Sequence, residues 1–144
     1  MGSVLNMEVY ARNVEDIKTF IESLVPKGME QINEYVEILK GLTSFQVCQT
    51  LYKMMSNSQF ERLKEDYGEQ RVLLPNSMWM ERKADVKSWC LFFAAILSRM
   101  NIEWKFRLHQ FPGSHSHYMY LVVETELGQV FLHTDPLAQF NEKF

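Results

Sequence analysis

ADVKSWCLFFAAILSRMNIEW, residues 84–104, contains the strongest structural signal in the chain. Asp85 is a good helix N-cap, and apolar residues follow it at spacings of three and four up to about Met100. The opposite side of this segment, which includes Phe92 and Ile96, is apolar as well. A helix that is apolar all round is normally enclosed by the rest of its protein. The sequence therefore predicts a central buried helix from Asp85 to about Met100.

The residues after this helix change to a strand-like pattern. From Ile102 to His109, apolar residues alternate with charged or polar ones, which is typical of a strand with one solvated face. Two further strands are predicted at residues 117–124 and 129–135, with a hairpin turn at residues 125–128 between them. Helices followed by an antiparallel sheet predict an α+β fold, in which the central helix packs on a small sheet.

The N-terminal part of the chain has the pattern of short amphipathic helices. Four are expected: residues 14–24, capped by Asn13 and stopped at Pro26 to Gly28; residues 29–39; a helix capped by Thr43 or Ser44; and a shorter segment at residues 60–67. Residues 68–83 are predicted to be a loop. We therefore expect a single domain, residues 1–144, with a helical part at 1–67 and the central helix and sheet at 84–144.

Composition and charge exclude several classes of protein. A chain of 144 residues, 47% of them apolar, is long enough to bury one core. The net charge of −3 gives no basic surface for nucleic acid, and the apolar run Leu91–Leu97 is too short to span a membrane. Cys48 and Cys90 lack the spacing of a zinc site, so we expect both to be reduced and buried. We expect a soluble protein without a cofactor or a nucleic-acid or membrane partner, and the oligomeric state stays open.

The predicted hairpin brings together a histidine and a carboxylate. If its centre lies near Glu126, His117 is opposite Asp135, with Cβ atoms about 5 Å apart. A histidine oriented by an aspartate, near the N-terminus of a buried helix, supplies two of the three parts of a cysteine hydrolase or acyltransferase site. The helix N-terminus would favour the third part, a thiolate, but the residue there is Val86.

A family resemblance is carried by three segments of the second half: RVLLPNSMWMERKADVKSWCLFFAAILSRMNIEWKFRL, SHYMYLVVE and LHTDPLAQFNEKF. They resemble the transglutaminase-like group of the papain-type cysteine hydrolase fold, especially its small phage versions. In that family an Asp-Cys pair opens the central helix, a histidine opens a strand and an aspartate follows the hairpin. Asp85, His117 and Asp135 match this pattern, and Val86 occupies the position of the nucleophilic cysteine.

The resemblance without the cysteine implies a catalytically silent module. Such a module would have a binding role or be a structural part of a phage particle or a similar assembly. Its partner would be a protein or peptide, and its location would be cytoplasmic or virion-associated. Trp79, Asp85, Trp89 and His115 are expected to line its binding cleft.

An active enzyme is the alternative hypothesis. It would be a peptidase, amidase or acyltransferase that uses His117 and Asp135 with Cys90 or another nucleophile. Cys90 shares a helix face with Val86 but lies one turn, roughly 6 Å, further along the axis, where the helix is apolar on all sides. A buried thiol has a raised pKa and is inert, which argues against this nucleophile. A third hypothesis is that Val86 is an engineered change in an otherwise active protein.

Two other chemistries remain open at the same hairpin. Histidine and carboxylate ligands suit zinc or iron, and the candidate ligands for such a site are His115, His117, His133 and Asp135. No HExxH or cysteine-rich spacing supports this site. Ser114 and Ser116 are candidate hydroxyl nucleophiles, but no strained elbow motif surrounds them.

Overall fold

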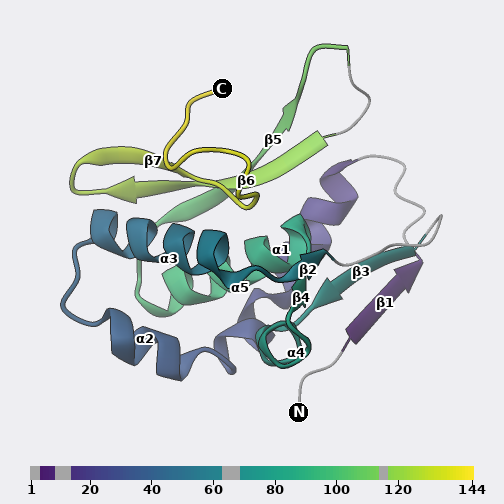
Figure 1. Ribbon diagram of the computed structural model, residues 1–144, viewed down its shortest axis with the longest axis horizontal. Coiled ribbons are helices and arrows are strands. Elements are labelled where there is room, and N and C mark those ends of the chain that lie inside the picture. Colours follow the sequence, from purple (N-terminus) through teal and green to yellow (C-terminus); the bar gives the residue numbers. More distant parts are fainter. Residues whose placement is uncertain (1–3, 9–13, 63–68, 114–116) are drawn as a thin grey trace.

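The computed structural model describes residues 4–8, 14–62, 69–113 and 117–144 (Figure 1). Its helices are α1 (Val14–Met29), α2 (Asn33–Leu39), α3 (Ser44–Ser58), α4 (Pro75–Glu81) and α5 (Val86–Arg99). Its strands are β1 (Val4–Glu8), β2 (Glu61–Arg62), β3 (Glu69–Leu73), β4 (Lys83–Ala84), β5 (Trp104–Gln110), β6 (His117–Thr125) and β7 (Gly128–Leu132). The fold class is therefore α+β, as predicted. Among the described helices, none has the length and apolar character needed to cross a membrane.

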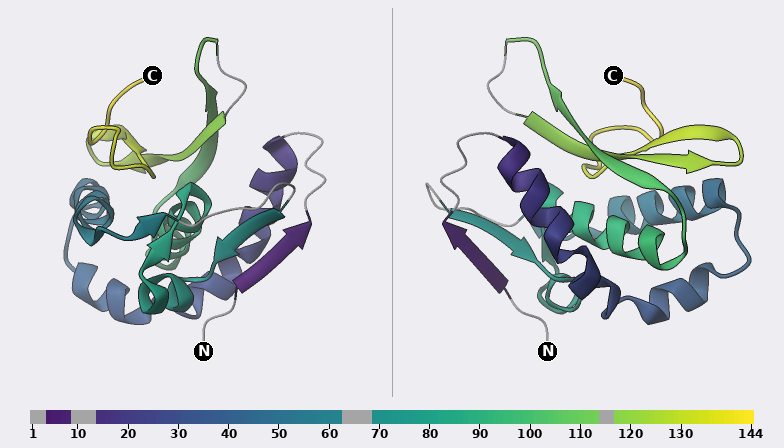
Figure 2. Two further views of the ribbon diagram at one scale, coloured as in Figure 1. Left: turned by 45° about the vertical axis from the view of Figure 1, so that its right-hand side comes forward. Right: turned by 180° about the vertical axis from the view of Figure 1, so that it is seen from behind.

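Helix α5 lies in the middle of the molecule, as predicted. Every residue from Ser88 to Leu97 is buried. The three-stranded sheet covers one side of α5, and α1, α2 and α4 contact its other sides (Figure 2). The Asp85 side chain caps the helix by accepting a hydrogen bond of 2.9 Å from the Ser88 backbone N–H. The all-round apolar sequence is thus explained by neighbours on every side.

The predicted end of the first helix at Pro26 to Gly28 is wrong, because α1 continues to Met29. A Cβ atom added to Gly28 would lie 3.2 Å from the Ala95 Cβ and 3.4 Å from Leu91 Cδ1, so this glycine allows α1 to approach α5 closely. Packing against α5 keeps the helix continuous although Pro26 cannot donate a backbone hydrogen bond. The predicted cap Asn13 lies outside the described residues.

Residues 60–84 also differ from the prediction. Strand β2 replaces the start of the helix expected at 60–67, and residues 63–68 lie outside the described part of the chain. Strand β3, helix α4 and strand β4 replace the loop expected at 68–83. Pro75 occupies the first turn of α4, where its missing N–H costs little. The helical part at 1–67 also contains β1, which pairs antiparallel with β3, while β2 pairs in parallel with β4.

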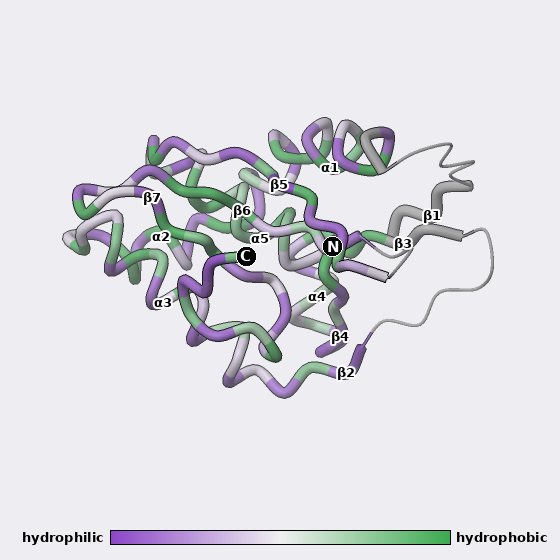
Figure 3. The backbone as a smooth tube through the Cα atoms, turned by 90° about the horizontal axis from the view of Figure 1, so that it is seen from above, coloured by the Kyte–Doolittle hydropathy of each residue, from purple (hydrophilic) through white to green (hydrophobic). Residues whose placement is uncertain are grey.

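The strands β5, β6 and β7 form one antiparallel sheet with β6 in the centre. The inner face packs on α5 through alternate residues such as Met119, Leu121 and Val123. The hydrophobic middle of β6 lies between its two neighbours in Figure 3. On the other face, Tyr118, Tyr120, Phe131, His133 and Phe144 form a second group of rings, which we call the outer aromatic cluster.

The tip of the β6–β7 hairpin docks on the N-terminus of α3. The Phe45 backbone N–H lies 3.2 Å from both carboxylate oxygens of Glu126. Thr43 and Gln46 also form a reciprocal capping box at the start of α3, so Thr43 is the cap among the two predicted candidates and Ser44 is the first helical residue. The first turn of α3 is therefore held both by its own residues and by the hairpin.

Candidate functional site

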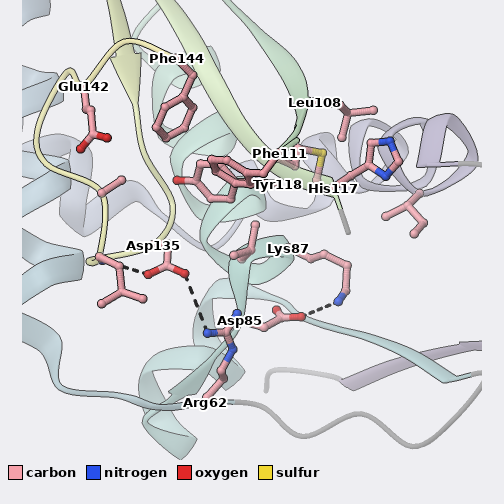
Figure 4. A pocket seen from close by; sticks show the side chains of 15 residues that line it. Arg62, Asp85, Lys87, Leu108, Phe111, His117, Tyr118, Asp135, Glu142 and Phe144 are labelled. Atoms are coloured by element: carbon pink, nitrogen blue, oxygen red, sulfur yellow. Dashed lines mark hydrogen bonds and ion pairs between the residues drawn. The ribbon is translucent and has the colours of Figure 1, made fainter. Parts of the chain in front are cut away.

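A cleft of about 580 Å³ opens at the N-terminal end of α5 (Figure 4). We call it the α5 cleft. Its walls come from α1, β2, the start of α5, the ends of β5 and β6, and the C-terminal segment 135–144. The lining residues are Ile17, Arg62, Asp85, Val86, Lys87, Leu108, Phe111, His117, Tyr118, Met119, Asp135, Leu137, Ala138, Glu142 and Phe144. Four of the predicted site residues, Asp85, Val86, His117 and Asp135, therefore share one cleft.

The helix end beside Val86 is held by a compact polar group. One Asp85 carboxylate oxygen accepts hydrogen bonds from the Ser88 backbone N–H and from Ser88 Oγ, at 2.9 and 2.8 Å. Ser88 Oγ in turn accepts a hydrogen bond of 3.0 Å from the Leu73 backbone N–H. The other Asp85 oxygen forms an ion pair of 2.6 Å with Lys87 Nζ. Because Asp85 and Ser88 are buried and hydrogen-bonded to each other, the position of Val86 between them is fixed relative to the cleft.

Asp135 does not orient His117. One Asp135 oxygen accepts a hydrogen bond of 2.9 Å from the Leu137 backbone N–H, and the other lies 3.8 Å from an Arg62 guanidinium nitrogen. Figure 4 shows the carboxylate directed toward Arg62 and not toward His117. Asp135 therefore stabilises the turn after β7 and pairs with a cation that sequence patterns did not predict. Pairing of β2 with β4 brings Arg62 to this place.

Asp135 does not lie opposite His117 because the hairpin register differs by one residue from the predicted register. Thr125 pairs with Gly128 and Leu121 with Leu132, so the connecting loop has two residues and no residue at its centre. Continued past Leu132, this register places Asp135 opposite Tyr118 and not opposite His117. His117 is exposed, pairs with Gln110 in the ladder, and forms no hydrogen bond with Asp135. The predicted opposition of His117 and Asp135 is therefore wrong, although both line the cleft.

A partly buried hydrogen-bond chain forms instead around Tyr118, the residue after His117. The Thr134 backbone N–H donates to the Tyr118 hydroxyl at 2.9 Å, and this hydroxyl lies 3.1 Å from His133 Nδ1. His133 Nε2 lies 2.7 Å from the Glu142 carbonyl oxygen. A carbonyl can only accept, so Nε2 carries the proton and Nδ1 accepts from Tyr118. Burial lowers the pKa of His133 and raises the pKa of Tyr118, so both groups are kept neutral.

Cys90 lies away from the cleft. Its side chain is completely buried, and its Sγ is 3.5 Å from the Met119 carbonyl oxygen. Burial raises the pKa of the Cys90 thiol well above its usual range and raises that of Cys48 to about 12. Both cysteines are free and buried, as expected. Among the described residues that line the α5 cleft, none carries a thiol or an aliphatic hydroxyl.

The other predicted site residues are divided between several places. Trp89 lines a second, smaller cavity of about 240 Å³, which shares Val86 with the α5 cleft. Trp79 packs between Tyr35 and Phe60 in the core and lines neither cavity. His115, Ser114 and Ser116 lie outside the described residues.

The described residues do not form a metal site at the hairpin. Within residues 4–8, 14–62, 69–113 and 117–144, no three His, Cys, Asp or Glu side chains are grouped as metal ligands would be. Both ring nitrogens of His133 are already in hydrogen bonds, and this ring lies in the outer aromatic cluster, away from His117. His133 and His117 therefore do not converge as the sequence pattern suggested.

Sequence patterns did not identify several residues of the cleft. Lys87, Tyr118, Glu142 and Phe144 belong to this group together with Arg62. A signal for Tyr118 did exist, because two-residue hairpin loops are the commonest kind and would have paired Tyr118 with the carboxylate. Comparison of the chain with protein-family models, curated proteins and solved structures found no match.

Proposed function

We propose that this chain is a catalytically silent module of the transglutaminase-like, cysteine-hydrolase type, and that its α5 cleft binds a protein or peptide segment. The observation that carries the proposal is Val86, which is the first residue of the central helix and lines the cleft together with His117 and Asp135. A nucleophile at this position would gain from the helix dipole, and valine has no group that can react.

The remaining contacts also argue against catalysis. A histidine base is effective when a carboxylate fixes its orientation, whereas Asp135 is engaged with Arg62 and Leu137. The alternative nucleophile Cys90 has a strongly raised pKa and no access to the cleft. The groups that would form an active cysteine enzyme are therefore separated.

A binding role is supported by the size and lining of the cleft. Its volume of about 580 Å³ lies within the usual range of ligand pockets, roughly 300–1,000 Å³. Leu108, Phe111 and Phe144 give it an apolar side, while the pairs Asp85–Lys87 and Arg62–Asp135 lie at its polar end. An apolar side chain next to a backbone amide offers the matching chemistry, and a polypeptide segment carries both.

Thiol labelling tests the silent site. The native chain should react with iodoacetamide only on unfolding, because both cysteines are buried. Val86→Cys should add one accessible thiol whose labelling rate titrates below pH 8.5, since the helix N-terminus favours the thiolate. Leu137→Cys is the matched control, because Leu137 lines the same cleft but belongs to no helix. Similar titration of the two introduced thiols near pH 8.5 would contradict the proposal.

Two further outcomes separate the hypotheses. Rapid labelling of one native thiol in the folded protein would instead support the active cysteine enzyme. Peptide binding is measured as slower labelling of Val86→Cys and Leu137→Cys when a peptide covers the cleft, relative to the rates without peptide. A panel of peptides that protects neither thiol would contradict the binding role.

A further inference from the structure

The two edges of the three-stranded sheet are treated differently. On β7, the Phe131 backbone N–H donates to Asn141 Oδ1 at 2.9 Å, and the Gln129 carbonyl accepts from Lys143 Nζ at 3.2 Å. These two side chains of the C-terminal segment therefore satisfy outward-facing groups of that edge. An edge closed in this way cannot easily accept another strand.

The β5 edge has no such closure. The Glu124 N–H donates to the Glu103 carbonyl at 3.0 Å, which makes Glu103 and Glu124 a hydrogen-bonded pair in the antiparallel register. By alternation, the backbone groups of Trp104, Phe106 and Leu108 point away from β6. Among the described residues, no hydrogen-bond partner occurs for these outward backbone groups. Figure 2 (right) shows β5 on the outside of the molecule, beside α1.

This open edge is continuous with the α5 cleft. Leu108 lies near the end of β5 and also lines the cleft, where Ile17 of α1 is another lining residue. A chain that paired with β5 would place every second side chain on the face that carries Phe106 and Leu108. Near Leu108 such a side chain would reach the apolar side of the cleft.

The charges along β5 indicate which kind of polypeptide could pair with this strand. Lys105 and Arg107 alternate with the apolar residues and therefore lie on the other face of the strand. The Arg107 guanidinium lies over the Phe131 ring at 5.0 Å, and neither cation has an ion pair with another described residue. Carboxylates opposite these two cations would stabilise the added strand. A second copy pairing through its own β5 would instead place like charges opposite each other, which disfavours self-association.

We infer that the free edge of β5 binds an extended polypeptide segment in which acidic residues alternate with apolar ones, so that the acidic side chains meet Lys105 and Arg107 and an apolar one enters the α5 cleft. This rests on the proposed function, because the segment is the ligand of that cleft. Main-chain hydrogen bonds to Phe106 and Leu108 supply the attachment, and the alternating side chains supply the selection.

The test uses two synthetic peptides of alternating sequence, one with glutamate and valine and one with lysine and valine, and follows amide hydrogen exchange of the native protein by NMR. The glutamate peptide should slow exchange at the Phe106 and Leu108 amides and bind about fivefold or more tightly than the lysine peptide. The double variant Lys105→Glu, Arg107→Glu should reverse this preference. Leu108→Pro, which removes one outward N–H from an edge strand, should weaken binding of the glutamate peptide.

Three results would overturn the inference. One is failure of the glutamate peptide to bind at millimolar concentration, and the second is an affinity that does not respond to the charge reversal. The third is a dimer of the native protein, seen by analytical ultracentrifugation, that Leu108→Pro abolishes. Protection of Val86→Cys from labelling without any change at the Phe106 and Leu108 amides would overturn the edge-binding inference alone and leave the proposed function standing.

Discussion

His117 and His133 belong to the same sheet region and have opposite surroundings. His117 begins β6 on the inner face, is exposed, and bonds no side chain of the described residues. His133 follows β7 on the outer face, is completely buried, and has both ring nitrogens in hydrogen bonds. A polar group with all its partners supplies stability, whereas one without partners in a cleft remains available for a ligand. His133 therefore has a structural role, whereas the His117 side chain is available to a ligand of the α5 cleft.

Replacement of the two histidines should give the largest difference. His133→Ala leaves the Tyr118 hydroxyl proton without an acceptor and the Glu142 carbonyl without its donor, and it opens a cavity in the outer aromatic cluster. We expect it to lower the free energy of unfolding by about 3 kcal/mol. His117→Ala should change it by less than about 0.5 kcal/mol. Urea denaturation measures both, and equal losses would refute the assignment of roles.

Tyr118→Phe is a milder change of the same hydrogen-bond chain. It removes only the hydroxyl, so the Thr134 N–H loses its acceptor and His133 Nδ1 loses its donor. The expected loss is about 1–2 kcal/mol in the free energy of unfolding. Tyr120→Phe is the matched control, because Tyr120 packs in the same cluster without a hydrogen bond to His133. If Tyr120→Phe costs as much as Tyr118→Phe, the hydrogen-bond chain is not what stabilises this face.

Asp85 and Asp135 extend the comparison to the two aspartates of the cleft. Asp85 is buried and caps α5, so Asp85→Ala should cost about 1 kcal/mol, whereas the pairing of Asp135 with the largely exposed Arg62 should contribute less than that. Thermal denaturation of Asp85→Ala and Asp135→Ala checks the order of the two effects. A larger loss for Asp135→Ala would show that its turn and ion pair hold more of the cleft than their exposure indicates.

A more gradual effect is the pH dependence contributed by His133. Burial lowers the pKa of this histidine in the folded protein, so the unfolded chain binds a proton more readily. The stabilisation is complete above the unfolded pKa of about 6.5 and is lost as pH falls from there through the folded pKa, by no more than about 1.4 kcal/mol per pH unit. His133→Phe should show a flatter stability profile below pH 6.5. Parallel profiles for the native protein and this variant would contradict the prediction.

The central helix and the fold class could be predicted from the sequence because their signals are local and strong. A cap at Asp85 followed by an all-round apolar segment specifies a buried helix without knowledge of its neighbours. The alternating pattern likewise predicted β5 and the β6–β7 hairpin, although the last strand ends at Leu132 and not at Asp135. Strand β2 has only two residues, so no period could reveal it or bring Arg62 to the cleft.

The site could be predicted to the level of the cleft but not to the level of its hydrogen bonds. Val86, His117 and Asp135 share the cleft because Val86 begins α5, His117 begins β6 and Asp135 follows the β6–β7 hairpin, and the sequence predicted these elements. Which residue meets which depends on the hairpin register, and a slip of one residue exchanges the two faces of a strand. That single step separates the expected His117–Asp135 pair from the observed Tyr118–His133 pair.

The contact between Glu126 and Phe45 has a consequence for the order of folding. These residues are separated by 81 positions, so this contact forms only when the hairpin tip reaches α3. The capping box of Thr43 and Gln46 needs no such closure and can start α3 while the sheet is still forming. Contacts that form after the rate-limiting step act mainly on the unfolding rate. The Glu126 contact would then set the lifetime of the docked hairpin through the unfolding rate, and it would have little effect on the folding rate.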